Sequence, residues 1–146
     1  MKKLLLMLSF AGSVFLAAAQ DPAQTPAPDP NAPDLKWEST TIDYGTVTKG
    51  DENNATRYFK FTNVGKSPLI IGDCRGSCGC TVPQCPKEPI LPGKGGEIKV
   101  HYDVNRVGQF TKTVTVTSNA KSPNETLKIQ GNVIDPAAQP APTEGK

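Results

Sequence analysis

The chain has 146 residues, with 16 Lys and Arg, 14 Asp and Glu and a single His, which gives a formal net charge of +2. Two of the basic residues, Lys2 and Lys3, belong to an N-terminal segment with the character of a removable leader, so the mature chain is expected to carry balanced charges. A chain without excess positive charge lacks the electrostatic footprint of a nucleic-acid-binding protein and has no basic run suited to an anionic membrane surface.

Residues 1–19 are predicted to be a secretory signal peptide. After the two lysines, residues 4–19 carry no charge, and the stretch ends on Ala17-x-Ala19, a pattern typical of a cleavage site. The alternative is a membrane anchor, but the apolar run is short for a membrane span. The residue directly after the predicted cleavage point is not a cysteine, so a lipoprotein start is not supported. We expect a periplasmic or secreted protein with no membrane span after cleavage.

Proline-rich segments flank the central region. Residues 20–35 are predicted to be a disordered, extended tether, and residues 135–146, which repeat its composition, a disordered tail. Both segments have few apolar side chains, so burial offsets little of the entropy lost on ordering them. Residues 36–134 remain as one folded domain.

Within residues 36–134, apolar and polar residues alternate with a period of two, which indicates β-strands. The segments with this alternation, or with a short apolar run, are 42–44, 58–62, 69–71, 97–103, 113–117 and 127–133. Gly, Pro, Asn and Asp dominate the segments between them, as expected for turns. Six or seven strands at this spacing predict an all-β fold, an antiparallel β-sandwich.

Short motifs run through the predicted domain in a fixed order. They are Asp43-Tyr-Gly45-Thr-Val47, Phe59-Lys-Phe61-Thr-Asn63-Val-Gly65, Ser77-Cys78-Gly79-Cys80-Thr81, Pro92-Gly93-Lys94, Thr117-Ser118-Asn119 and Gly131-x-Val133. In this order they resemble the DUF1573 family, small secreted bacterial proteins common in Bacteroidetes, over about residues 38–134. The resemblance implies export and an immunoglobulin-like, PapD-like sandwich of about seven strands. It implies no activity, because the function of the family is unknown.

The four cysteines, Cys74, Cys78, Cys80 and Cys85, lie within twelve positions, in a predicted long connection of residues 73–96. Residues 77–81 match the core motif of the family, whereas the first and last cysteine depart from its usual pattern. An even cysteine count in a small exported domain favours disulfides. A bond between Cys78 and Cys80 would close a very tight ring, and geometry argues against it. The open pairings are 74–80 with 78–85, 74–78 with 80–85, and 74–85 with a strained or open 78/80 pair.

The four sulfurs could also bind a metal ion or form a redox site. Cys78 and Cys80 are candidate ligands for copper or zinc, since Cys-x-Cys brings two soft donors together, but the spacing is a weak match to structural zinc sites. The single imidazole, His101, alternates onto the polar face of its strand, where a solvated side chain is expected. A redox site is the third interpretation, although the Cys-x-x-Cys motif of thioredoxin-like proteins is absent.

No pattern of a hydrolase, a phosphate-binding loop or a His-rich metal site occurs in the sequence. We therefore predict a non-enzymatic exported module, without a cofactor, that binds an unidentified protein partner or supports an envelope structure. The alternative is a periplasmic copper or zinc protein that uses the Cys74–Cys85 cluster.

Overall fold

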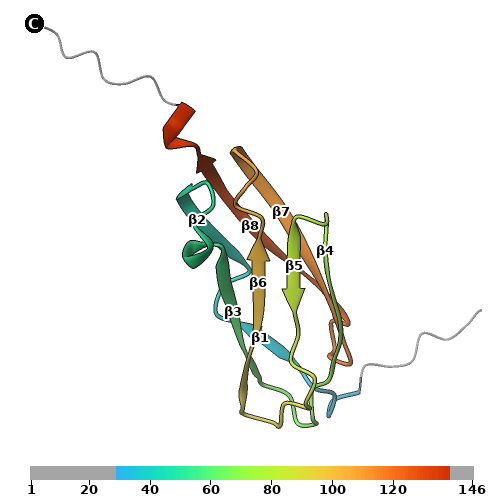
Figure 1. The fold of residues 1–146 in the computed structure, drawn as a ribbon. Coiled ribbons are helices and arrows are strands. Elements are labelled where there is room, and N and C mark those ends of the chain that lie inside the picture. The colour runs from blue at the N-terminus through green and yellow to red at the C-terminus, as the bar shows by residue number, and fades with distance from the viewer. Residues whose placement is uncertain (1–28, 139–146) are drawn as a thin grey trace, which may run out of the picture.

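The computed structural model describes residues 29–138, which form a sandwich of two four-stranded β-sheets (Figure 1). The strands are β1 (Leu35–Trp37), β2 (Thr41–Thr48), β3 (Thr56–Asn63), β4 (Ile71–Gly76), β5 (Thr81–Gln84), β6 (Gly95–Tyr102), β7 (Gly108–Ser118) and β8 (Asn124–Ile134). One sheet has the order β1-β3-β6-β5 and the other β2-β8-β7-β4. The helical elements of the described part are two short 3-10 turns, η1 (Glu52–Asn54) and η2 (Pro136–Ala138).

The predicted signal peptide and most of both proline-rich segments lie outside the described residues. Within residues 29–138, no helix has the length and the apolar character needed to cross a membrane.

The core lies between the two sheets, and its side chains are those that the alternation predicted. The inward residues of both sheets are at most 2% exposed: Phe59, Phe61, Ile98, Val100, Val114, Val116, Leu127 and Ile129. Burial of each such side chain contributes about 1.5–3 kcal/mol before chain entropy is counted. The predicted all-β sandwich is therefore confirmed, and its core is built by β3, β6, β7 and β8.

The architecture differs from the prediction in strand number and in one strand direction. The structure has eight strands rather than about seven, and β2 pairs with β8 in parallel, whereas the other strand pairs of the described chain are antiparallel. The expectation of a wholly antiparallel sandwich is wrong for this pair. Side-chain alternation has the same period in both kinds of sheet, so it does not encode direction.

Strand β2 also continues past Gly45, where the sequence pattern predicted its end. Gly45 has a φ of 66°, and the register with β8 shifts between Asp43 and Thr46. Glycine adopts positive φ without a Cβ clash, so the chain bulges here and resumes its pairing. Beyond the bulge, Val47 returns to the core and is 3% exposed.

The segment before β1 is bound to the sandwich, which corrects the prediction of a tether that reaches residue 35. The backbone N–H of Lys121 donates to the carbonyl of Pro33 at 3.0 Å, and the Ser67 hydroxyl donates to the carbonyl of Asn31 at 2.6 Å. Leu35 then begins a strand that pairs with β3. Proline lacks an N–H but keeps its carbonyl acceptor, so a proline-rich segment can still dock through its oxygens. Residues 20–28 of the predicted tether lie outside the described part.

Tyr44 links the two sheets through the core. Its side chain comes from β2, and its hydroxyl donates a hydrogen bond to the carbonyl of Val100 in β6 at 3.0 Å. The ring packs edge-on against Phe110, with centroids 5.6 Å apart, and the Arg57 guanidinium lies 4.6 Å from its centroid. Burial raises the pKa of Tyr44 to about 12, and the charge of Arg57 acts in the opposite direction.

This raised pKa predicts a loss of stability at alkaline pH. The phenol of Tyr44 stays neutral in the folded chain while it ionises in the unfolded chain near its ordinary pKa of 10.0. The contribution of the neutral phenol to the free energy of unfolding is therefore fully present below pH 10 and is lost as the pH rises from there towards about 12. We expect Tyr44→Phe to lose about 1 kcal/mol at neutral pH, from the missing hydrogen bond.

The difference in unfolding free energy between Tyr44→Phe and the wild-type chain should shrink or reverse above pH 10. Urea titrations of both proteins across this range measure it. A difference in unfolding free energy that stays constant with pH would contradict the raised pKa of Tyr44.

Candidate functional site

The cysteine segment forms two edge strands, where the sequence pattern predicted one long connection. Strand β4 pairs with β7 in one sheet, and β5 pairs with β6 in the other, so the chain crosses between the sheets over residues 77–80. Both strands are short and contain Gly or Pro, and Pro83 is tolerated because β5 lies at an edge. Because of this composition, the two strands show no clear alternation of apolar and polar residues.

Cys74 and Cys85 form a disulfide that joins the two sheets. Cys74 lies in β4, Cys85 follows β5 directly, and their Cα atoms are 6.0 Å apart. Because β4 and β5 are the edge strands of different sheets, the bond closes one side of the sandwich (Figure 1). Both cysteines are half-buried against the core. The bond therefore has an evident structural role.

Cys78 and Cys80 form the second disulfide, which corrects the argument against this pair. Their Cα atoms lie 5.2 Å apart, within the ordinary range for disulfides. A turn closed by the N–H of Thr81, which donates to the carbonyl of Cys78 at 3.2 Å, brings them together around the exposed Gly79. The pairings 74–80 with 78–85 and 74–78 with 80–85 are not those of the structure.

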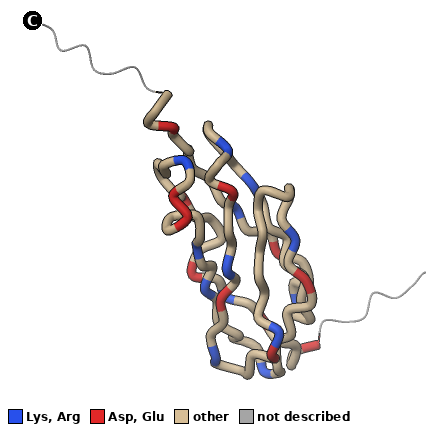
Figure 2. Tube along the Cα trace, viewed as in Figure 1, with Lys and Arg blue, Asp and Glu red and all other residues tan. Residues whose placement is uncertain are grey.

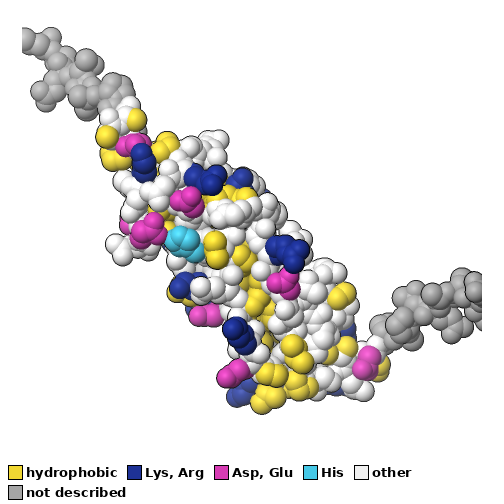
Figure 3. Space-filling model, turned by 45° about the vertical axis from the view of Figure 1, so that its right-hand side comes forward, with side chains coloured by type: hydrophobic (Ala, Val, Ile, Leu, Met, Phe, Trp, Pro, Cys, Tyr) yellow, Lys and Arg dark blue, Asp and Glu magenta, His cyan; other side chains and the backbone are white. Residues whose placement is uncertain are grey.

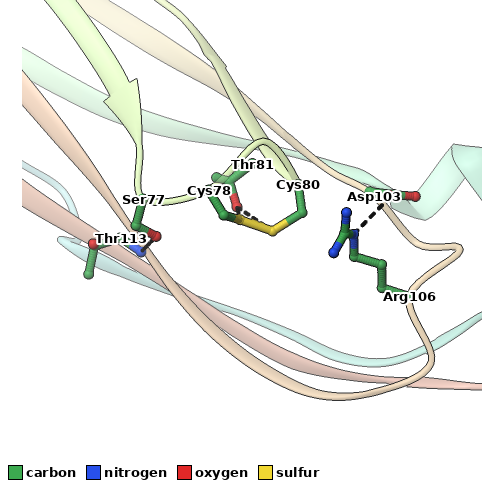
Figure 4. The surroundings of a disulfide bond; sticks show 7 residues. All are labelled: Ser77, Cys78, Cys80, Thr81, Asp103, Arg106 and Thr113. Atoms are coloured by element: carbon green, nitrogen blue, oxygen red, sulfur yellow. Dashed lines mark hydrogen bonds and ion pairs between the residues drawn. A yellow bond between two sulfur atoms is a disulfide. The ribbon is translucent and has the colours of Figure 1, made fainter.

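Hydrogen bonds hold the Cys78–Cys80 turn on both sides, and Figure 4 shows the one between Ser77 and Thr113. Before the turn, Ser77 and Thr113 of β7 exchange two bonds: the Ser77 N–H donates to the Thr113 carbonyl at 2.9 Å, and the Thr113 N–H donates to Ser77 Oγ at 3.1 Å. At its other end, the N–H of Asp103 donates to the carbonyl of Cys80 at 2.9 Å. The position of the turn therefore does not depend on its sulfur atoms alone.

Thr81 and Gly76 shape the inner side of the turn. The Thr81 side chain is buried, and its Oγ1 lies 3.6 Å from Sγ of Cys78 and 3.9 Å from Sγ of Cys80. A Cβ at Gly76 would collide with the backbone oxygen of Thr81, so only glycine allows the two strand ends to approach this closely.

An ion pair from the β6–β7 connection borders the turn. Arg106 Nε contacts Asp103 Oδ2 at 3.1 Å, and Figure 4 shows the guanidinium on the Cys80 side of the disulfide. Hydrogen bonds from the backbone N–H of Asn105 and from Arg106 hold the pKa of Asp103 below its ordinary value. Asp103, Arg106 and Thr113 were not predicted from the sequence, because only the pairing of β5 with β6 and of β4 with β7 brings them to the cysteines.

The metal hypothesis for Cys78 and Cys80 remains a prediction for the reduced chain. Metal ions bind the thiolate, and here the two sulfurs are bonded to each other. In the described part of the chain, no group of three or more His, Cys, Asp and Glu side chains is arranged to hold a metal ion. His101 contacts Glu52 at 3.7 Å from its Nε2, and its side chain is 37% exposed.

Residues 35–133 match the sequence profile of a family described as a protein of unknown function, DUF1573. No curated protein matches the chain in sequence.

Among solved structures, the chain is similar to a protein of unknown function from Porphyromonas gingivalis W83. The identity is 16% and the TM-score 0.62, over 74% of this chain and 50% of that chain, so this chain spans half the length of that protein. It is also similar to the ASH / PapD-like domain 7 of human CEP192, with 9% identity and a TM-score of 0.60 over 83% of this chain and 98% of that domain.

The same fold occurs in proteins with different roles. A component of the CsuC–CsuE chaperone–tip adhesion subunit complex of Acinetobacter baumannii matches with 11% identity and a TM-score of 0.50, over 68% of this chain and 56% of that chain. Part of the Vibrio cholerae VesB protease matches with 15% identity and a TM-score of 0.55, over 68% of this chain and 32% of that chain. Likeness at these identities establishes the immunoglobulin-like, PapD-like fold alone.

The two disulfides are expected to differ in what they contribute to stability. Cys74–Cys85 spans 11 positions and joins two sheets, so replacing both residues by serine should lower the free energy of unfolding by about 2–3 kcal/mol. The matched double variant, Cys78→Ser with Cys80→Ser, should lose clearly less, because its bond spans two positions and constrains little of the unfolded chain. Urea titrations of both variants measure the difference, and equal losses would contradict it.

Proposed function

Because the chain belongs to the DUF1573 family of proteins of unknown function, we propose that it is an exported, non-catalytic module that binds another protein. The observation that carries this proposal is an apolar surface at the end of the sandwich opposite the Cys78–Cys80 turn. Two disulfides and a fold shared with a chaperone–subunit complex support an extracytoplasmic location and a protein partner.

A short antiparallel bridge between the β3–β4 and β5–β6 connections builds this surface. Leu69 and Ile90 exchange two backbone hydrogen bonds, at 2.9 and 2.8 Å, and both side chains are buried. Side chains alternate along an extended chain, so the residues on either side of this pair face outwards. The outward set is apolar and exposed: Pro68, Ile70, Pro89 and Leu91.

Val64 and Pro92 extend this set, and the six residues together are called the end patch. Val64, Ile70 and Leu91 are 53%, 47% and 56% exposed. Figure 3 shows apolar side chains gathered at this end of the molecule. Figure 2 shows Lys, Arg, Asp and Glu positions interspersed along the described chain, this end included, so charged residues border the patch. Exposed apolar side chains gathered at one end of a domain are a feature of protein-binding sites.

A buried amide holds the loops of the end patch in place. Asn63 is fully buried, and its Nδ2 donates to the carbonyls of Ser67 and Ile90, both at 2.9 Å. Its Oδ1 accepts from the N–H groups of Gly65 at 3.0 Å and Asp34 at 3.3 Å. One side chain thus connects both patch loops and the segment before β1. A surface fixed in this way loses little conformational entropy on binding.

The test compares the patch with exposed apolar residues elsewhere. Ile70→Ser with Leu91→Ser removes patch surface, and Val82→Ser with Val107→Ser is the matched control, because those valines are 50% and 55% exposed outside the patch. The exported chain and both variants are used as bait against an envelope extract, with mass spectrometry of what each retains. We expect a partner held by the wild-type and control chains, and at least about tenfold less of it on the patch variant.

Sedimentation velocity of the same three proteins separates a foreign partner from self-association. Retention of the same proteins by all three chains would contradict the proposal, and so would loss of binding in the control variant alone.

A further inference from the structure

The Cys78–Cys80 disulfide is not explained by the stability of the fold. It spans two positions, and a crosslink this short removes little entropy from the unfolded chain. The backbone on both sides of the turn is already fixed by the Ser77–Thr113 and Cys80–Asp103 hydrogen bonds. The sheets are joined separately by Cys74–Cys85. Opening the short bond therefore leaves the constraints on the sandwich in place.

The two cysteines of this bond differ in their exposure to solvent. Cys80 is 3% exposed and belongs to the core, whereas Cys78 is half-buried at the surface. Gly79 between them is exposed, and an added Cβ there would meet no atom within 4 Å apart from those of its two chain neighbours. An incoming thiolate can therefore approach Cys78 over a bare glycine. It has no comparable route to Cys80.

A hydroxyl next to the bond can stabilise the sulfur that leaves. Attack on Sγ of Cys78 makes Sγ of Cys80 the leaving group, and the rate of exchange rises as the leaving thiolate is stabilised. Thr81 Oγ1 lies 3.9 Å from this sulfur and 3.6 Å from Sγ of Cys78, so its O–H can donate to the leaving thiolate, while the choice of Cys78 as the attacked sulfur rests on its greater exposure. The Arg106 guanidinium lies on the same side of the bond (Figure 4), with part of its charge neutralised by Asp103.

We propose that Cys78–Cys80 is a thiol–disulfide exchange site that transfers its disulfide to a dithiol of another exported protein. A thiolate of the dithiol attacks Sγ of Cys78, the Cys78–Cys80 bond breaks, and Cys80 leaves as a thiolate that takes up a proton. The second thiolate of the dithiol then attacks its own sulfur in the mixed disulfide and releases Cys78, which also takes up a proton. The dithiol loses two electrons and two protons, and this chain gains both.

This transfer is stoichiometric, with one disulfide per chain, and it does not use the end patch. The patch variant with Ile70→Ser and Leu91→Ser should therefore exchange as the wild-type chain does. Failure of the exchange proposal and failure of the protein-binding proposal are thus separable.

The first test uses the exported wild-type chain and graded dithiothreitol as the dithiol. Samples are alkylated under native conditions, and peptide mass spectrometry measures labelling at each pair. We expect Cys78 and Cys80 to be labelled at a dithiothreitol concentration at least about tenfold below that needed for Cys74 and Cys85. The near-ultraviolet circular dichroism should show that the chain stays folded. Opening of both bonds together, or opening only on unfolding, would overturn the proposal.

The second test separates the two sulfurs. In Cys80→Ser the remaining thiol is Cys78, and in Cys78→Ser it is Cys80. Ellman's reagent should react with the first at least about tenfold faster than with the second. Thr81→Val in the wild-type background should slow opening by dithiothreitol, and Thr81→Ser should restore it, because only serine keeps the hydroxyl. Equal reactivity of the two thiols would refute the assignment of the attacked sulfur.

Discussion

The passage of the chain from one sheet to the other between β4 and β5 is the constraint on which the rest of the architecture depends. Four residues make this crossing, and a disulfide from Cys74 to Cys85 fixes the two edge strands on either side of it. The crossing places the Cys78–Cys80 turn at its apex and sets where β5 meets β6. The connection after β5 must then travel to the far end of the sandwich, where Ile90 meets Leu69.

The two ends of the molecule are therefore chemically different. One end carries the end patch, with Asn63 as the buried link between its loops and the segment before β1. Towards the other end lies a sulfur pair backed by Thr81 and bordered by Asp103 and Arg106 (Figure 4). Hydrogen bonds hold both sites: the Asn63 amide and the Leu69–Ile90 bridge at the patch, and bonds to Thr113 and Asp103 at the sulfur pair. The two sites therefore lie apart on the sandwich, and substitutions at one leave the residues of the other unchanged.

Much of the fold could be predicted from the sequence, because the strands that build the core alternate clearly. Phe59 and Phe61, or Leu127 and Ile129, face the core at every second position, as their pattern indicates. Strands β4 and β5 lacked this signal, since their residues lie at sheet edges and include Gly72, Gly76 and Pro83. The direction of β2 was not accessible either, because alternation is the same in parallel and antiparallel pairs.

The candidate sites were predictable only in part. The four cysteines were visible, but their pairing depends on the turn that Thr81 closes around Gly79, which is a property of three-dimensional geometry. The end patch could not be found from composition, because Ile70 and Leu91 belong to apolar runs whose neighbours, Leu69 and Ile90, are buried. The Leu69–Ile90 bridge decides which members of those runs face solvent.

The parallel pairing of β2 with β8 has a consequence for how the protein reaches its folded state. Ile42 is paired with Ile129, and Val47 with Val133. Strand β2 therefore cannot complete its pairing before β8 is available. Contacts this distant in sequence form slowly, because a long stretch of polypeptide must be closed before any of them is made. A growing chain cannot complete this sheet until its final strand has left the ribosome.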